Sequence, residues 1–206
     1  MGRQTISEFL DELADRVPAP GGGATAALHL AQAAGLLGMV ARYTTGVKYA
    51  QHAAVIADII AATDTARARG LRLADADAQA FTAVSQAYRL PRDSPQQQNR
   101  RHTVIACALV QAAGPPADVI AAAAALLSAA ETLLPIANHT VMTDVAAATE
   151  AARAAATTAR LNVEINLGGI ADETVRATLT TVLEQVESII DRAAAVQQSV
   201  RDRLNR

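Results

Sequence analysis

Helical periodicity runs through almost the whole chain and constrains its fold more than any other feature. Apolar side chains recur at helical spacing in each long segment, and no segment alternates with the two-residue period of a strand. Alanine is the commonest apolar residue, whereas aromatic residues make up only 2% of the chain. Helix-formers are therefore abundant and bulky strand-formers scarce. The sequence predicts an all-α protein.

Capping motifs, glycines and prolines predict where the helices begin and end. The segments Thr5 to Glu8 and Ser94 to Gln97 both have the pattern of capping boxes, in which side chains satisfy free backbone amides. Proline is excluded from helix interiors, so Gly114-Pro115-Pro116 is expected to end a helix. The predicted helices cover about residues 5–17, 24–43, 49–90, 95–113, 117–134, 140–166 and 172 onwards.

The length of the chain favours a single domain. At 206 residues it is long enough for one compact core and short for two, so one domain is expected over residues 1–206. Small alanine side chains let helix axes approach closely, which favours a tight bundle of about six to seven long helices. Because so many apolar faces need cover, we also expect the bundle to form a homodimer.

Charge and composition argue against several classes of protein. A net charge of −2 and a pI near 6.1 provide no field that attracts nucleic acids or acidic membranes, so neither is an expected partner. Cys107 is the only cysteine and is predicted to pack in the core, which fits a cytoplasmic protein. No signal peptide is visible. Residues 24–41 lack charge, but their small side chains predict a buried central helix rather than a membrane span.

Lys48 is the only lysine in the chain, beside 17 arginines. An amine can shift its pKa and release a proton, whereas a guanidinium effectively cannot. Lys48 also lies in a glycine-containing loop between two long predicted helices, where functional residues concentrate. It is therefore a candidate catalytic residue; the alternative is a surface lysine that survived by chance.

Asp77 is a carboxylate within an apolar helical stripe. Its neighbours on that stripe are Leu73, Phe81, Val84 and Tyr88. A carboxylate in such a position is partly desolvated, and it then pairs with a cation or has its pKa raised. Asp77 is thus a second candidate catalytic residue, and the alternative is a structural ion pair with an arginine of a neighbouring helix.

Three further motifs have both a structural and a functional interpretation. Gly21, Gly22 and Gly23 form either a tight turn or a set of bare amides that binds an anion, but they match no nucleotide-binding loop. Asp144 either caps a helix or takes part in catalysis. Asn162 and Asn166 lie four residues apart on one helical face, where their amides hold a ligand or tie the following loop.

Aromatic residues lie close to both candidate catalytic groups. If their helices meet, Tyr43, Tyr49, Phe81 and Tyr88 would line a pocket with one amine and one carboxylate, suited to a flat heterocycle. Core packing would explain the same pattern. The four histidines show no paired spacing, so no metal site is expected.

A series of short motifs now becomes informative as a set: Ser7-Glu8-Phe9-Leu10, Pro18 to Ala27, Gly46-Val47-Lys48-Tyr49, Asp75 to Phe81, Tyr88-Arg89-Leu90-Pro91, Thr143-Asp144 and Leu161 to Leu167. In sequence and order they resemble the formiminotransferase-cyclodeaminase C-terminal domain family, which includes stand-alone bacterial methenyltetrahydrofolate cyclohydrolases. The resemblance covers nearly the whole chain. It implies a cyclodeaminase-like helical dimer with a folate substrate, and it raises the functional weight of Lys48, Asp77, Asp144 and Asn162.

The resemblance implies two related activities. Cyclohydrolases of the family interconvert 5,10-methenyl- and 10-formyltetrahydrofolate, and its cyclodeaminases convert 5-formiminotetrahydrofolate to the methenyl form with loss of ammonia. Because no fused transferase domain is visible, we expect the first activity, with the second as the alternative. A folate-binding or purely structural helical dimer without turnover is the alternative from another class.

The expected mechanism uses no cofactor beyond the tetrahydrofolate that carries the substrate carbon. The pterin ring would lie on the aromatic face, Asp77 or Asp144 would stabilise the cationic one-carbon bridge, and Lys48 would shuttle a proton. The tail carboxylates of the folate need cationic or amide partners. Candidates for that role are Arg42, Arg89, Arg92 and the amides of Gly21 to Gly23.

Overall fold

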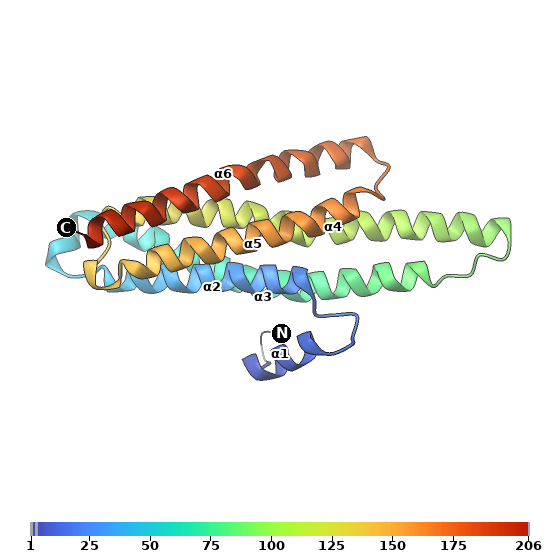
Figure 1. The fold of residues 1–206 in the computed structure, drawn as a ribbon, viewed down its shortest axis with the longest axis horizontal. Coiled ribbons are helices and arrows are strands. Elements are labelled where there is room, and N and C mark those ends of the chain that lie inside the picture. Colours follow the sequence, from blue (N-terminus) through green and yellow to red (C-terminus); the bar gives the residue numbers. More distant parts are fainter. Residues whose placement is uncertain (1, 3, 206) are drawn as a thin grey trace.

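The computed structural model describes residues 2 and 4–205 of the chain. The described residues form six α-helices and two 3₁₀ turns, without a strand: α1 (Ile6–Ala14), α2 (Gly22–Tyr43), η1 (Val47–His52), α3 (Ala53–Tyr88), α4 (Pro95–Leu133), η2 (His139–Val141), α5 (Thr143–Leu167) and α6 (Glu173–Leu204). Helices α2 to α6 run lengthwise in one elongated bundle, and α1 lies apart from it (Figure 1). The prediction of an all-α bundle is confirmed.

The predicted helix starts near residues 5, 95 and 172 are confirmed by their hydrogen bonds, whereas the long third helix begins at Ala53, after the 3₁₀ turn, and not at residue 49. At the start of α1 the backbone N–H of Glu8 donates to Thr5 Oγ1, and the N–H of Thr5 donates to the Glu8 carboxylate. Ser94 and Gln97 form the same reciprocal pair at the start of α4. Asp172 caps α6 by accepting hydrogen bonds from two backbone amides. These side chains satisfy donors that the first turn of a helix leaves free.

The expected break at Gly114-Pro115-Pro116 does not occur, because α4 continues through both prolines. Each proline removes one amide donor and crowds the carbonyl one turn earlier, which normally ends a helix. The buried face of α4 nevertheless runs without interruption across the prolines, from Ala112 to Val119. Packing along this face keeps the two halves in line, so tertiary contacts override the local preference. The predicted fourth and fifth helices are therefore one helix.

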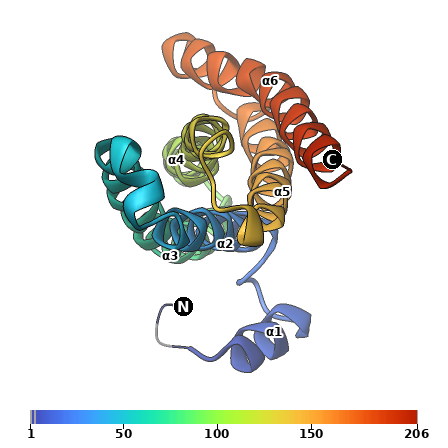
Figure 2. The ribbon, with the colours of Figure 1, turned by 90° about the vertical axis from the view of Figure 1, so that its left-hand side faces the viewer.

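Helix α2 lies between α3 and α5 and makes its most extensive contacts with these two helices (Figure 2). Gly70 of α3 packs directly on the α2 backbone. A Cβ atom placed on Gly70 would lie 2.8 Å from the carbonyl oxygen of Ala27 and 2.9 Å from the Cβ of Ala31. The absence of a side chain here lets the two helix axes approach closely, as the small-residue composition predicts.

Two helices, α2 and α4, are long and apolar enough to cross a membrane by length and composition alone. The most apolar window of α2 is 61% buried inside the bundle and that of α4 is 39% buried. The burial of α2 agrees with its prediction as a central helix. Cys107 on α4 is exposed, so its predicted core position is wrong. The neighbouring Ala108 and Leu109 face inward, and the helical rotation turns Cys107 outward.

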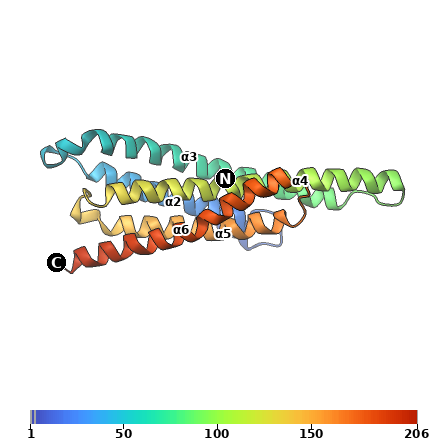
Figure 3. The ribbon, with the colours of Figure 1, turned by 90° about the horizontal axis from the view of Figure 1, so that it is seen from above.

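The outer ends of α3 and α4 form a hairpin that projects beyond the turn between α5 and α6 (Figures 1 and 3). Helix α5 ends near the base of this hairpin, close to the start of α2 (Figure 1). The base of the hairpin is therefore bordered by the start of α2 and the end of α5. These four segments enclose the candidate site.

Candidate active site

A cleft of about 380 Å³ opens where the start of α2 meets the outer half of α3, the middle of α4 and the end of α5. It brings together most of the residues that the sequence predicted for the site: Gly21, Gly22, Gly23, Asp77, Phe81, Tyr88, Asn162 and Asn166. These residues come from three segments that are far apart in the chain. The fold thus joins the glycine motif, the carboxylate stripe and the asparagine pair around one cavity.

Asp77 reaches from α3 to the first turn of α2. Its carboxylate accepts a hydrogen bond from the backbone N–H of Ala24. A Cβ atom on Gly23 would lie 2.0 Å from the Asp77 Oδ1, so only glycine permits this approach. The predicted start of this helix at residue 24 is too late, because Gly21 is the N-cap and Gly22 and Gly23 are already helical. The carboxylate therefore rests on the positive end of the α2 dipole.

Burial raises the pKa of the Asp77 carboxyl above its usual value, and the hydrogen bond from Ala24 lowers it by a smaller amount. Among the described residues, no arginine or lysine forms an ion pair with Asp77. The alternative interpretation of Asp77, a structural ion pair with an arginine, therefore does not hold among the described residues. A half-buried carboxylate without a cationic partner in the protein is suited to a cationic ligand.

The two asparagines lie on the opposite wall, on α5. The Nδ2 atom of Asn162 donates to the carbonyl oxygen of Thr158 at 2.9 Å, and that of Asn166 donates to the carbonyl oxygen of Asn162 at 2.7 Å. These bonds fix both side chains against their own helix, so they do not tie the following loop. The side-chain oxygens remain as acceptors for the N–H groups of a ligand.

The rest of the wall is apolar. Phe81, Val84 and Tyr88 of α3 face Leu109 and Ala112 of α4 across the cleft. Phe81 and Tyr88 are 51% and 52% exposed, so much of each ring is open to a ligand. The contribution of α4 was missed by the sequence analysis, because Leu109 and Ala112 look like ordinary core residues. This wall offers flat apolar surface to an aromatic ligand.

Lys48, Tyr49 and Asp144 lie near the opposite end of the bundle. Helix α2 contacts Asp77 at its first turn, and its 22 residues, which span roughly 33 Å, separate that turn from Lys48. Lys48 is exposed, with Nζ 5.3 Å from the centre of the Tyr49 ring, and Tyr49 lines a separate hollow of about 300 Å³. Asp144 is in the first turn of α5. Within one chain, the expected convergence of Lys48 with Asp77 does not occur.

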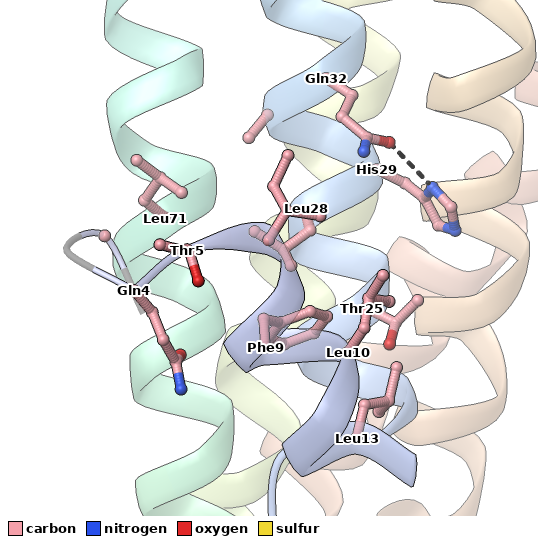
Figure 4. Close-up of a pocket in the computed structure, with 13 residues that line it drawn as sticks. Gln4, Thr5, Phe9, Leu10, Leu13, Thr25, Leu28, His29, Gln32 and Leu71 are labelled. Carbon is pink, nitrogen blue, oxygen red and sulfur yellow. Dashed lines mark hydrogen bonds between the residues drawn. The ribbon is translucent and has the colours of Figure 1, made fainter.

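A second cavity of about 420 Å³ lies between α1 and the faces of α2 and α3 (Figure 4). Phe9 of α1 is buried against it, whereas Ile6 and Leu10 are largely exposed. His29 is the only titratable side chain among the described lining residues, and its Nδ1 lies 3.4 Å from the Oε1 of Gln32. This cavity has no carboxylate or amine for acid–base chemistry. The Asp77 cleft is therefore the better candidate active site.

Comparison with known proteins identifies the family of the chain. The family model for formiminotransferase-cyclodeaminase matches residues 5–185. The chain belongs to this family. A formiminotetrahydrofolate cyclodeaminase from Thermotoga maritima has a similar crystal structure, with a TM-score of 0.84, 31% identity, and coverage of 97% of this chain and 98% of that one. The cyclodeaminase-like fold is therefore shown.

Two curated members of the cyclodeaminase family carry different names. A methenyltetrahydrofolate cyclohydrolase from Methylorubrum extorquens is 31% identical over 200 residues, which cover 97% of this chain and 95% of that protein. A formimidoyltransferase-cyclodeaminase from Sus scrofa is 32% identical over 97% of this chain, which spans only 36% of that longer protein. The chain thus corresponds to nearly all of the first relative and to about a third of the second.

Proposed function

We propose that this member of the cyclodeaminase family is an enzyme of folate one-carbon metabolism, a methenyltetrahydrofolate cyclohydrolase that interconverts 5,10-methenyl- and 10-formyltetrahydrofolate. The observation that carries the proposal is the half-buried Asp77 carboxylate, unpaired with any described cation, in a cleft with flat apolar walls. The substrate provides the missing cation, because its bridging carbon shares a positive charge with two ring nitrogens. Similarity along the full length of a relative with that name supports the same activity.

The proposed reaction is addition of water to the bridging carbon. The carbon–oxygen bond forms as Asp77 accepts a proton from the attacking water. The bond from the carbon to N5 then breaks as N5 takes a proton and the new hydroxyl loses its proton to become the formyl oxygen. The formyl group stays on N10, and one proton is released overall. Asp77 also stabilises the cationic bridge before attack, since the two charges lie together in a partly desolvated site.

The proposal requires no metal or redox cofactor, because acid–base catalysis and charge placement suffice for addition to an activated carbon–nitrogen bond. It also requires no nucleic acid and no membrane. We propose a cytoplasmic location, which the free thiol of Cys107 supports.

The second candidate is a formiminotetrahydrofolate cyclodeaminase. The solved structure from Thermotoga maritima carries that name and matches this chain along almost its whole length. The two reactions use the same carbon and differ in whether water is added or ammonia is lost.

One experiment separates the candidates. The purified protein is given 5,10-methenyltetrahydrofolate, and then 5-formiminotetrahydrofolate, while the absorbance of the methenyl form and the release of ammonia are followed. We expect loss of methenyl absorbance from the first substrate and no ammonia from the second. Ammonia release would favour the cyclodeaminase, and stoichiometric binding without product would indicate a folate-binding module.

We further propose that the active form is a homodimer in which a second copy brings Lys48 to the cleft. Around the cleft, several large apolar side chains lie in water in the single chain: Phe81, Tyr88, Leu161 and Ile165, which are 51% to 78% exposed. A second copy would remove this surface from water, which favours association. Lys48 is too far from Asp77 within one chain, so any catalytic role for it needs a partner.

This dimer makes a complementation prediction. Lys48→Ala and Asp77→Asn are each expected to lose turnover as homodimers, because every site then lacks one of its two groups. When the two variants are unfolded, mixed and refolded together, hybrid dimers contain one site with both native residues, and a measurable part of the turnover should return. Full activity of Lys48→Ala alone, or no recovery on mixing, would contradict the shared site. Light scattering checks the oligomeric state of each sample.

A further inference from the structure

Arg101 on α4 has features that neither folding nor the proposed chemistry explains. Its Nε atom is buried and is the only such side-chain atom without a hydrogen-bond partner among the described residues. Its guanidinium lies 5.6 Å from the centre of the Tyr88 ring, and one terminal nitrogen donates to the Tyr88 carbonyl oxygen at 3.2 Å. No carboxylate within the described part of the chain forms an ion pair with it. A guanidinium that is held in place and has unused hydrogen-bond donors is suited to bind an anion.

Arg101 lies close to the cleft. Tyr88, over which the guanidinium lies, is a lining residue, and so is Leu109, about two turns further along α4. Arg101 and Leu109 are eight residues apart, a spacing that places them on the same face of the helix. Arg101 therefore stands just beyond the lined cavity, at the Tyr88 end. The Asp77 end is roughly 16 Å away along α3, at 1.5 Å per residue.

The charge at this end of the hairpin is mainly positive. Between residues 89 and 102 the chain has a single carboxylate, Asp93, against four arginines: Arg89, Arg92, Arg100 and Arg101. The cleft thus runs from an acidic group at Asp77 to a basic end at Arg101. A ligand that is cationic at one end and anionic at the other matches this polarity.

A reduced folate has this polarity, with the one-carbon bridge at one end, an aromatic ring in the middle and a glutamate with two carboxylates at the other end. We infer, on the basis of the proposed function, that Arg101 binds a carboxylate of the glutamate tail and so selects substrates that carry it. With the bridge at Asp77, the aromatic ring lies along Phe81 and Tyr88. The carboxylates then reach the guanidinium, which donates two hydrogen bonds to one of them.

The other arginines considered for this role are less suited. Arg42 is near the opposite end of α2 and is paired with Asp64 at 2.6 Å. Arg89 and Arg92 are exposed in the turn region after α3. Arg101 is partly buried and is held by Tyr88, so it loses less side-chain freedom when it binds a carboxylate.

The test compares Arg101→Gln with the control Arg100→Gln, which removes the same charge from the adjacent exposed position. Each variant is assayed with 5,10-methenyltetrahydrofolate and with 5,10-methenyltetrahydropteroate, which lacks the glutamate. For Arg101→Gln we expect KM for the folate to rise about tenfold or more, the loss typical of one charge-assisted hydrogen-bonded pair. Its kcat, and its KM for the tail-less substrate, should stay near wild type. Arg100→Gln should resemble wild type with both.

An equal rise in KM for both substrates, or no rise for the folate, would overturn the assignment. Arg101→Lys is the second variant, for use if glutamine at this position disturbs folding. It keeps the positive charge and should recover part of the preference for the folate over the substrate that lacks the glutamate. Binding of tetrahydrofolate and tetrahydropteroate is also measured by calorimetry. If the wild-type protein turns over neither substrate, the proposed function fails, yet the binding difference between these two ligands still decides the role of Arg101.

Discussion

Asp77→Asn is expected to reduce the turnover of methenyltetrahydrofolate by about a hundredfold or more, the range for loss of a general acid–base group. The asparagine amide keeps the size of the side chain and can still accept the hydrogen bond from the N–H of Ala24. It cannot take a proton from water or balance the charge of the cationic bridge. The measurement is kcat/KM from the decay of methenyl absorbance.

The pH dependence should identify the group. The carboxylate must be ionised to act, and burial raises its pKa above the usual 3.8, so the acid limb of kcat/KM in the wild-type enzyme should lie above that value. The limb should disappear in Asp77→Asn. A carboxyl whose pKa is raised by folding holds its proton more tightly in the native state, so stability falls as pH rises from the unfolded to the folded pKa. At neutral pH, Asp77→Asn should therefore melt no lower than wild type.

Asp58→Asn is the matched control, since Asp58 is exposed on the same helix and far from the cleft. It should keep wild-type turnover and the wild-type pH profile. A comparable loss of activity in both variants would show that a change of charge on α3, rather than chemistry at Asp77, explains the result. An acid limb that persists in Asp77→Asn would assign it to another group.

Gly70→Ala is expected to lower the free energy of unfolding by about 1–2 kcal/mol. The new methyl group would lie 2.8 Å from a backbone carbonyl oxygen of α2 and 2.9 Å from Ala31, so two helices must separate along their closest contact. Overpacking of this kind costs about 1–3 kcal/mol, and the better helix propensity of alanine returns up to about 1 kcal/mol. Denaturant titration followed by circular dichroism measures the change.

Gly35→Ala provides the opposite result from the same chemical change. Gly35 lies within α2, and a Cβ atom there would meet nothing within 4 Å. Only the propensity gain remains, so the free energy of unfolding should rise by about 0.5–1 kcal/mol. If both variants were stabilised, the close approach of α2 and α3 at Gly70 would not be a constraint on the fold.

Local sequence patterns were sufficient to predict most of the fold. The capping boxes at Thr5 and Ser94 act within one turn, so their hydrogen bonds depend on neighbours along the chain and are visible in the sequence. The continuation of α4 through Pro115 and Pro116 could not be predicted from the sequence, because it depends on a buried face that only the folded bundle supplies. The prediction that Cys107 packs in the core was wrong for a related reason. Apolar neighbours along the chain do not determine which side of a helix faces the core.

The candidate site shows the same limit. Asp77, Phe81 and Tyr88 share one helical stripe, so their grouping follows from periodicity. Asn162 and the glycines join them only through the packing of α5 and α2 against α3. Lys48 was grouped with Asp77 because aromatic residues lie close to each of them in the sequence, but the length of α2 separates the two residues. Arg101 gave no signal among 17 arginines, since the buried Nε atom that distinguishes it depends on its surroundings.

The seat of Asp77 on the opening turn of α2 also affects how the site responds to a ligand. Helix α2 packs against α3, α4 and α5, so the amide beneath the carboxylate belongs to an element that is held on several sides. The electrostatic environment of the reacting carbon is consequently set during folding, and little reorganisation energy remains to be supplied when substrate arrives. A preorganised site of this kind selects a substrate that fits it, so changes in specificity should arise among the exposed side chains of the cleft wall rather than at Asp77.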